Sequence, residues 1–169
     1  MPANIEIKAR VADPESLLAK AEKLTDTEPE TILQTDTFFN VETGRLKIRE
    51  FADGTGELIS YHRPDAEGPK TSSYSLAPTP DAGALRDTLA AALPVRGVVR
   101  KTRLLLLAGR TRIHLDEVEG LGSFMELEVV LKDGDDPREG ETEAADLMEK
   151  LGVTPADLVR GAYIDMLEK

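Results

Sequence analysis

The chain has 169 residues, of which 40% are hydrophobic and 31% charged, a composition typical of a folded globular domain rather than a disordered chain. The formal net charge of −11 disfavours nucleic acid and anionic membranes as partners, and the lack of cysteine excludes disulfides, thiolate metal sites and cysteine catalysis. The first residues show no signal-peptide pattern, and no run reaches the ~20 apolar residues of a membrane span. We therefore expect one domain over residues 1–169 and a cytoplasmic location.

The predicted elements begin with the segment ANIEIKAR, from Ala3 to Arg10, in which apolar and charged residues alternate as they do in a strand. A helix is predicted next, because Asp13 can serve as N-cap, Pro14 suits the first helical position, and the following residues form an apolar stripe. Four more strands are then predicted, over residues 34–40, 45–51, 57–63 and 70–76.

The second half of the chain returns to a helix and then to strands. Leu85, Leu89 and Leu93 recur at helical spacing and predict a helix. Three strands and two closing helices are then predicted, over residues 98–107, 110–118, 122–132, 141–151 and 155–168. This order indicates an α+β domain built on about eight mostly antiparallel strands.

Basic residues recur on one face of the predicted strands, although the protein as a whole is acidic. In RLKIRE, for example, Arg45, Lys47 and Arg49 share the face opposite Leu46 and Ile48. On a single antiparallel strand such a row usually faces water. Repeated like charges repel one another, however, unless an anion lies among them, and the arginine fork suits phosphate oxygens. The bases in question are Lys8, Arg45, Lys47, Arg49, Arg63, Lys101, Arg103 and Arg112.

The acidic residues of the strands cluster separately, on the first strand and the last. They are Glu6, Glu126 and Glu128. Carboxylate oxygens are the ligands that hard divalent cations prefer, and substrate phosphates can complete the coordination shell. A sheet curled around its polar face, with its apolar face outward under the helices, would therefore enclose a site for a polyphosphate with Mg²⁺ or Mn²⁺.

The same segments resemble the CYTH superfamily, the triphosphate tunnel metalloenzymes that include class IV adenylate cyclases, thiamine triphosphatases and inorganic triphosphatases. NIEIK is similar to the family's ExExK motif at Glu6 and Lys8. The basic strand RLKIR, the pair in KTR, and LDEVEGLGSFMELE with its late Asp and ExE pair agree in order and spacing. The resemblance covers essentially the whole chain.

The resemblance implies an eight-stranded antiparallel barrel with flanking helices, whose tunnel binds a triphosphate-containing small molecule with Mg²⁺ or Mn²⁺. By matching position, the implied metal ligands are Glu6, Asp116, Glu126 and Glu128. The implied phosphate contacts are all eight basic residues named above, with Lys8, Arg63 and Lys101 as the catalytic ones. Catalysis would then be mostly electrostatic.

One residue departs from the motif, because Asn4 stands where the family has its first Glu. An amide offers an oxygen but no charge, so a weaker metal site is expected. Three functions remain open: hydrolysis of tripolyphosphate or a small organic triphosphate, cyclisation of ATP, and triphosphate binding without turnover. Hydrolysis demands less of the site than cyclisation, which also needs a purine pocket and a group that activates the ribose hydroxyl, so hydrolysis is placed first. A homodimer is compatible with the sequence, but no residue requires one.

Overall fold

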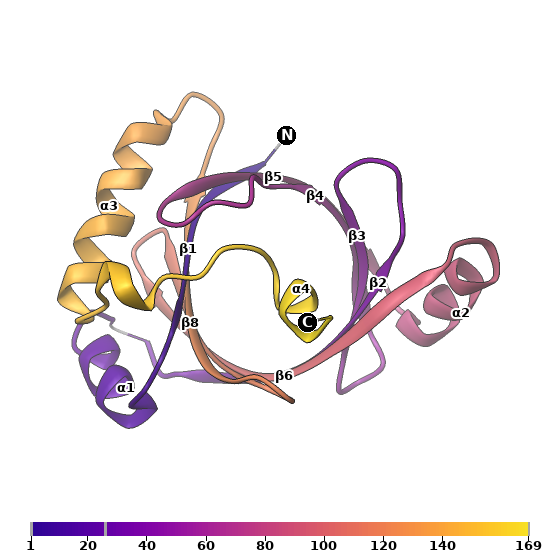
Figure 1. Cartoon of the computed structure of the whole chain (residues 1–169), viewed down its shortest axis with the longest axis horizontal. Coiled ribbons are helices and arrows are strands. Elements are labelled where there is room, and N and C mark those ends of the chain that lie inside the picture. The colour runs from indigo at the N-terminus through magenta and orange to yellow at the C-terminus, as the bar shows by residue number, and fades with distance from the viewer. Residues whose placement is uncertain (1, 26, 169) are drawn as a thin grey trace.

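The computed structural model describes residues 2–25 and 27–168, and in this part of the chain eight strands form a closed barrel (Figure 1). The order around the barrel is β1-β5-β4-β3-β2-β6-β7-β8, and every neighbouring pair is antiparallel. The strands are β1 (Ala3–Arg10), β2 (Glu30–Phe39), β3 (Arg45–Phe51), β4 (Gly56–His62), β5 (Lys70–Thr79), β6 (Val95–Ala108), β7 (Thr111–Val118) and β8 (Gly122–Leu131). The predicted α+β fold, with an eight-stranded antiparallel barrel and flanking helices, is confirmed.

Helices cover the outside of the barrel. They are α1 (Pro14–Glu22), α2 (Ala82–Ala92) and α3 (Pro137–Lys150). A 3₁₀ turn at Pro155–Asp157 and the short helix α4 (Tyr163–Leu167) follow, and α4 lies within the ring of strands in Figure 1. In Figure 1, α1 and α3 lie outside β1 and β8, whereas α2 lies on the far side of the ring. None of the helices in the described residues is long and apolar enough to cross a bilayer.

The hydrophobic core lies between the barrel wall and these helices. Ile5 and Ile7 of β1 are fully buried in one cluster with Leu17 of α1 and Leu147 of α3. On the other side, Ile48 of β3 is buried with residues of α2. Because side chains alternate along a strand, burying the apolar face outward turns the charged face of each strand toward the barrel interior.

The C-terminal segment corrects a prediction, since residues 155–168 do not form one helix. After the 3₁₀ turn, Val159 N donates to Lys8 O at 3.0 Å, so the chain runs beside the end of β1 in extended form. Gly161 then adopts φ +78°, which allows the chain to turn into α4. Tyr163 and Ile164 are 4% and 2% exposed and pack with residues inside the barrel wall, so α4 closes one end of the barrel.

Helix α3 begins four residues earlier than the predicted 141–151 helix. Asp136 is the N-cap, its side chain accepts from Arg138 N at 2.9 Å, and Pro137 takes the first helical position. These local signals extend the helix into a strongly acidic stretch.

Candidate active site: a charged tunnel through the barrel

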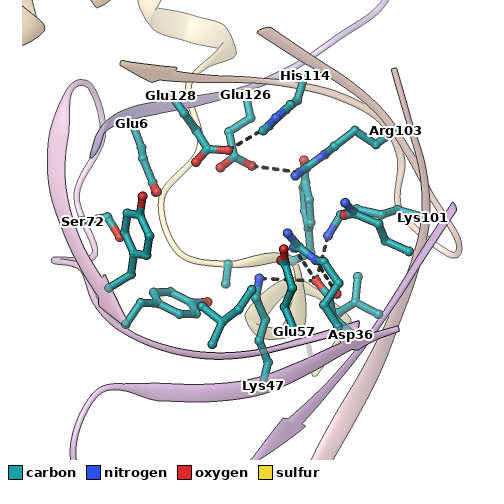
Figure 2. A pocket seen from close by; sticks show the side chains of 18 of the residues that line it. Glu6, Asp36, Lys47, Glu57, Ser72, Lys101, Arg103, His114, Glu126 and Glu128 are labelled. Atoms are coloured by element: carbon teal, nitrogen blue, oxygen red, sulfur yellow. Dashed lines mark hydrogen bonds and ion pairs between the residues drawn. The ribbon is translucent and has the colours of Figure 1, made fainter. Parts of the chain in front are cut away.

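The interior of the barrel is a tunnel of about 290 Å³, and all eight strands of the described chain contribute side chains to its wall. Glu6 and Lys8 of β1 line it and are only 8% and 4% exposed. The charged row of the first strand therefore faces the interior. Tyr163 of α4 lines the closed end, and Figure 2 shows the labelled side chains converging on the open space.

Asp36 of β2 is the centre of a cationic cluster on one wall. Its two carboxylate oxygens accept from Arg49 Nε and Nη2 at 2.8 Å each. Oδ2 also lies 2.9 Å from Lys101 Nζ and 3.4 Å from Lys47 Nζ. Burial opposes ionisation of this carboxyl, but the three cations outweigh burial and hold the pKa of Asp36 well below its usual range. One carboxylate thus faces three positive charges, and this wall is net positive.

A second ion pair connects the barrel to α4. Arg103 Nε and Nη2 donate to the two carboxylate oxygens of Asp116 at 2.8 Å each, and the Tyr163 hydroxyl donates to Asp116 Oδ2 at 2.7 Å. Lys8 Nζ lies 3.9 Å from the centre of the Tyr163 ring, within cation–π range. Helix α4 therefore orients two of the predicted phosphate-binding cations as well as closing the tunnel.

The opposite wall is acidic. Glu6 of β1 pairs with Glu128 of β8 across the sheet, and Glu126, two residues along β8, pairs with Lys8. Glu6 Oε2 accepts from Arg63 Nη1 at 3.0 Å. Burial, with repulsion from Glu126 and Glu128, raises the pKa of Glu6 to about 7. Burial also disfavours ionised Glu126, but Lys8 and other nearby cations outweigh it, so the pKa of Glu126 lies below its usual range.

The side chains of this acidic wall could hold a divalent cation. His114, Glu126 and Glu128 each present a ligand atom within 4.8 Å of the others. His114 Nδ1 lies 3.0 Å from Glu128 Oε1. Asn4 Nδ2 donates to Glu128 Oε2 at 2.8 Å, while its Oδ1 is buried with no hydrogen-bond partner in the described chain. A hard cation bound by the two glutamates would give that amide oxygen a partner.

Several cationic groups in the tunnel have unused donors. Arg63 Nε and Nη2 are buried without a hydrogen-bond partner among the described residues, and so is Arg112 Nε. Lys8 Nζ makes one long hydrogen bond, 3.5 Å to Gly161 O. Buried donors normally find partners, so an anionic ligand with several oxygens would complete this arrangement.

Burial lowers the pKa of three lysines of the tunnel, Lys8, Lys47 and Lys101. Burial lowers the pKa of Lys101 to about 7, because the nearby Asp36 offsets only part of the desolvation cost. Burial likewise lowers the pKa of Lys8 to about 8, although the nearby carboxylate of Glu126 favours the charged form and offsets part of this effect. Lys8 and Lys101 therefore take up a proton readily when an anion enters the tunnel, because the anion stabilises their charged forms.

Most of the sequence-predicted site residues lie together in this tunnel, but two do not line it. Arg45 lies near the closed end and pairs with Asp165 at 2.7 Å and Asp65 at 3.2 Å. Asp116 lies behind Arg103, whose guanidinium occupies both of its oxygens. The predicted residues that do line the tunnel are Glu6, Lys8, Lys47, Arg49, Arg63, Lys101, Arg103, Arg112, Glu126 and Glu128.

Sequence reasoning missed two residues that line the tunnel and pair with its charged groups. Asp36 shares a face with Gln34 and Phe38 in QTDTFF, so strand alternation alone could have placed it inside. Tyr163 carried no such signal, because its position depends on the non-helical turn at Gly161. His114, for which the sequence left the orientation open, lines the tunnel and is 4% exposed.

A closed antiparallel barrel around a tunnel of paired cations and clustered carboxylates defines a class of protein, and comparison with known proteins agrees. The CYTH domain model matches residues 2–163, so the chain belongs to the CYTH family. A search of curated protein sequences finds no match.

Solved structures show the same fold. The PH1012 protein of Pyrococcus horikoshii OT3 is 25% identical, with TM-score 0.82, over 96% of this chain and 98% of that one. A Vibrio parahaemolyticus protein described as a candidate adenylate cyclase is 20% identical, with TM-score 0.80, over 98% of both chains. HpAC1 from Hippeastrum, described as a candidate adenylyl cyclase with a dominant triphosphatase activity, is 16% identical, with TM-score 0.68, over 98% of this chain and 95% of that one.

Proposed function

We propose that this protein is a divalent-metal-dependent triphosphatase that hydrolyses the terminal phosphate of a triphosphate bound inside the tunnel. The observation that carries the proposal is the set of buried guanidinium donors without partners, above all Nε and Nη2 of Arg63. Such donors are costly unless a ligand uses them, and arginine matches phosphate oxygens best. Membership of the CYTH family supports the same conclusion.

The acidic wall would hold the metal. Glu126, Glu128 and His114 would supply ligands, the Asn4 amide donates to Glu128, and Glu6 pairs with Glu128 in the sheet. Mg²⁺ or Mn²⁺ bound there would supply Lewis-acid stabilisation of phosphate oxygens. We assign Asp116 a positioning role, because its oxygens hold Arg103 and Tyr163.

The chain's own residues would perform the rest of the chemistry. Lys8, Arg63 and Lys101 would donate to phosphate oxygens on which negative charge develops during transfer to water. Lys47, Arg49 and Arg103 would keep the triphosphate extended between the two walls, with Arg112 at the other end of the tunnel from α4. Because α4 packs across one end of the barrel, it would limit the access of bulk water from that side.

The test is release of phosphate and of cyclic AMP from tripolyphosphate, ATP and thiamine triphosphate, with Mg²⁺ and separately with Mn²⁺. We expect phosphate release from at least one substrate, and its loss in Lys8→Ala. Release of cyclic AMP and pyrophosphate from ATP would show that the protein catalyses cyclisation instead of hydrolysis. Tight triphosphate binding without any turnover would instead make the protein a binding module.

A further inference from the structure

The open end of the tunnel is chemically unlike its middle. Four apolar side chains line it, each from a different strand: Leu105 of β6, Ile32 of β2, Phe51 of β3 and Leu76 of β5. With β4, these strands are consecutive in the barrel order, so the four side chains lie on one side of the tunnel, and we call them the mouth arc. They lie at the ends of the strands away from α4.

The mouth arc is accessible rather than part of the packed core. Leu76 is 41% exposed, and the other three side chains are partly exposed. None of the four belongs to the buried clusters around the barrel wall in the described chain. A partly exposed apolar arc inside a ligand tunnel offers contact area that phosphate oxygens do not need.

Two polar side chains lie next to the mouth arc, and the proposed phosphate site does not involve either of them. Glu57 of β4 extends toward the centre of the tunnel (Figure 2), and none of the described cations forms an ion pair with it. Its cross-strand neighbour Arg49 is held by both oxygens of Asp36. Gln34, paired with Phe51 in the sheet, is 6% exposed, and its Oε1 is buried without a hydrogen-bond partner among the described residues.

We propose that the mouth arc, with Glu57 and Gln34, binds the organic part of an organic triphosphate, an apolar group that carries hydrogen-bond donors. This inference rests on the proposed triphosphate function and narrows its substrate class. Glu57 and Gln34 Oε1 are both acceptors, so they select for hydroxyl or amino groups. Inorganic tripolyphosphate has neither an apolar surface nor such donors.

The same residues set the orientation of the substrate. A carboxylate at the open end repels phosphate, whereas the middle of the tunnel has unused guanidinium donors. The triphosphate therefore enters first and the organic group stays at the mouth arc. Glu57 would also help to discriminate between ligands. Its carboxylate accepts hydrogen bonds from an organic group but stays unpaired when inorganic tripolyphosphate binds, and an unpaired polar group disfavours that ligand.

The experiment compares Glu57→Gln with wild type in calorimetric binding of ATP and of tripolyphosphate, and in kcat/KM for both, with Mg²⁺ present. We expect ATP to bind more tightly than tripolyphosphate. Glu57→Gln should lose about tenfold in ATP affinity, because a charged acceptor is replaced, and should bind tripolyphosphate as well as wild type or better. Leu76→Ala should shift the preference in the same direction.

Glu42→Gln is the matched control, since Glu42 is exposed in the turn between β2 and β3, outside the tunnel. Equal effects of Glu57→Gln on both ligands, or a preference for tripolyphosphate over ATP, would overturn the inference. Because binding is measured apart from turnover, the two proposals fail separately. Tighter binding of ATP than of tripolyphosphate without any hydrolysis would refute the triphosphatase proposal and support the role of the mouth arc. Hydrolysis without a difference in affinity between ATP and tripolyphosphate would support the triphosphatase and refute the role of the mouth arc.

Discussion

Asp36 and Arg49 form a two-point ion pair inside the barrel, in which each carboxylate oxygen lies 2.8 Å from a guanidinium nitrogen. The same carboxylate also faces Lys101 and Lys47, so it is the counter-charge of a whole wall. Charges fixed by mutual pairing in this way are what electrostatic preorganisation requires.

Asp36→Asn should be strongly destabilising, because it leaves buried cations without their counter-charge. Breaking a buried ion pair costs about 3–5 kcal/mol of unfolding free energy. The measurement is urea unfolding, with Asp87→Asn as control, since Asp87 is 74% exposed and pairs with Arg86 at the surface. Added tripolyphosphate should stabilise Asp36→Asn more than wild type. Equal stability of Asp36→Asn and wild type would show that the wall does not need this carboxylate.

Arg63→Gln should abolish most of the activity while leaving the fold intact. Gln can still donate to Glu6 but cannot supply the two donors that Arg63 leaves free. The loss of two charge-assisted hydrogen bonds predicts a fall of about 100-fold or more in kcat/KM. Arg110→Gln is the control, because Arg110 pairs with Glu143 outside the tunnel and should change kcat/KM by less than about twofold. A similar fall in both variants would contradict a specific role for Arg63.

Triphosphate binding should take up protons above neutral pH. With its pKa lowered to about 7, Lys101 is mostly neutral at pH 8, and a bound anion should restore its charge. Calorimetry in buffers of different ionisation enthalpy should show uptake of about one proton or more at pH 8. Lys101→Met should reduce the uptake and leave a part from Lys8, whose pKa is about 8. Identical proton uptake in wild type and variant would place the titrating group elsewhere.

The same lysine predicts how stability depends on pH in the ligand-free protein. Its pKa is about 7 when folded against an ordinary 10.5, so the unfolded chain binds more protons between these values. The contribution of Lys101 to stability therefore rises with pH across this window. Urea unfolding of wild type and Lys101→Met should show a smaller rise in the variant between pH 7 and 10. A rise of the same size in both would refute this assignment.

Asn4→Glu should strengthen metal binding. Adding a carboxylate beside Glu128, to which Asn4 now donates at 2.8 Å, raises the negative charge of the acidic wall. We expect Mn²⁺ affinity, measured by electron paramagnetic resonance, to rise about tenfold, with Asn40→Glu in an exposed turn as control. A large parallel rise in activity would mark a weakened enzyme, and no change in affinity would mean that the site never relied on a ligand at this position.

The sequence alone determined the barrel and most of its lining. Alternation along the strands is a local property, so Glu6, Lys8 and the basic rows could be assigned to one face without coordinates. The apolar face had to meet the helices, which left the charged face inside. The cap at Asp13 and the start of α1 at Pro14 were predicted for the same local reasons.

Only the tertiary structure decided which charges pair with one another and which remain free. Asp36 pairs with Arg49 because the two residues are opposite each other in neighbouring strands. Asp116 does not line the tunnel because it is bound to Arg103. Arg63, in contrast, has two donors without a partner among the described residues. The C-terminal segment looked helical from its composition, but its pairing with β1 and the turn at Gly161 carried Tyr163 into the barrel. These outcomes depend on contacts between residues far apart in the chain, and local periodicity does not encode such distances.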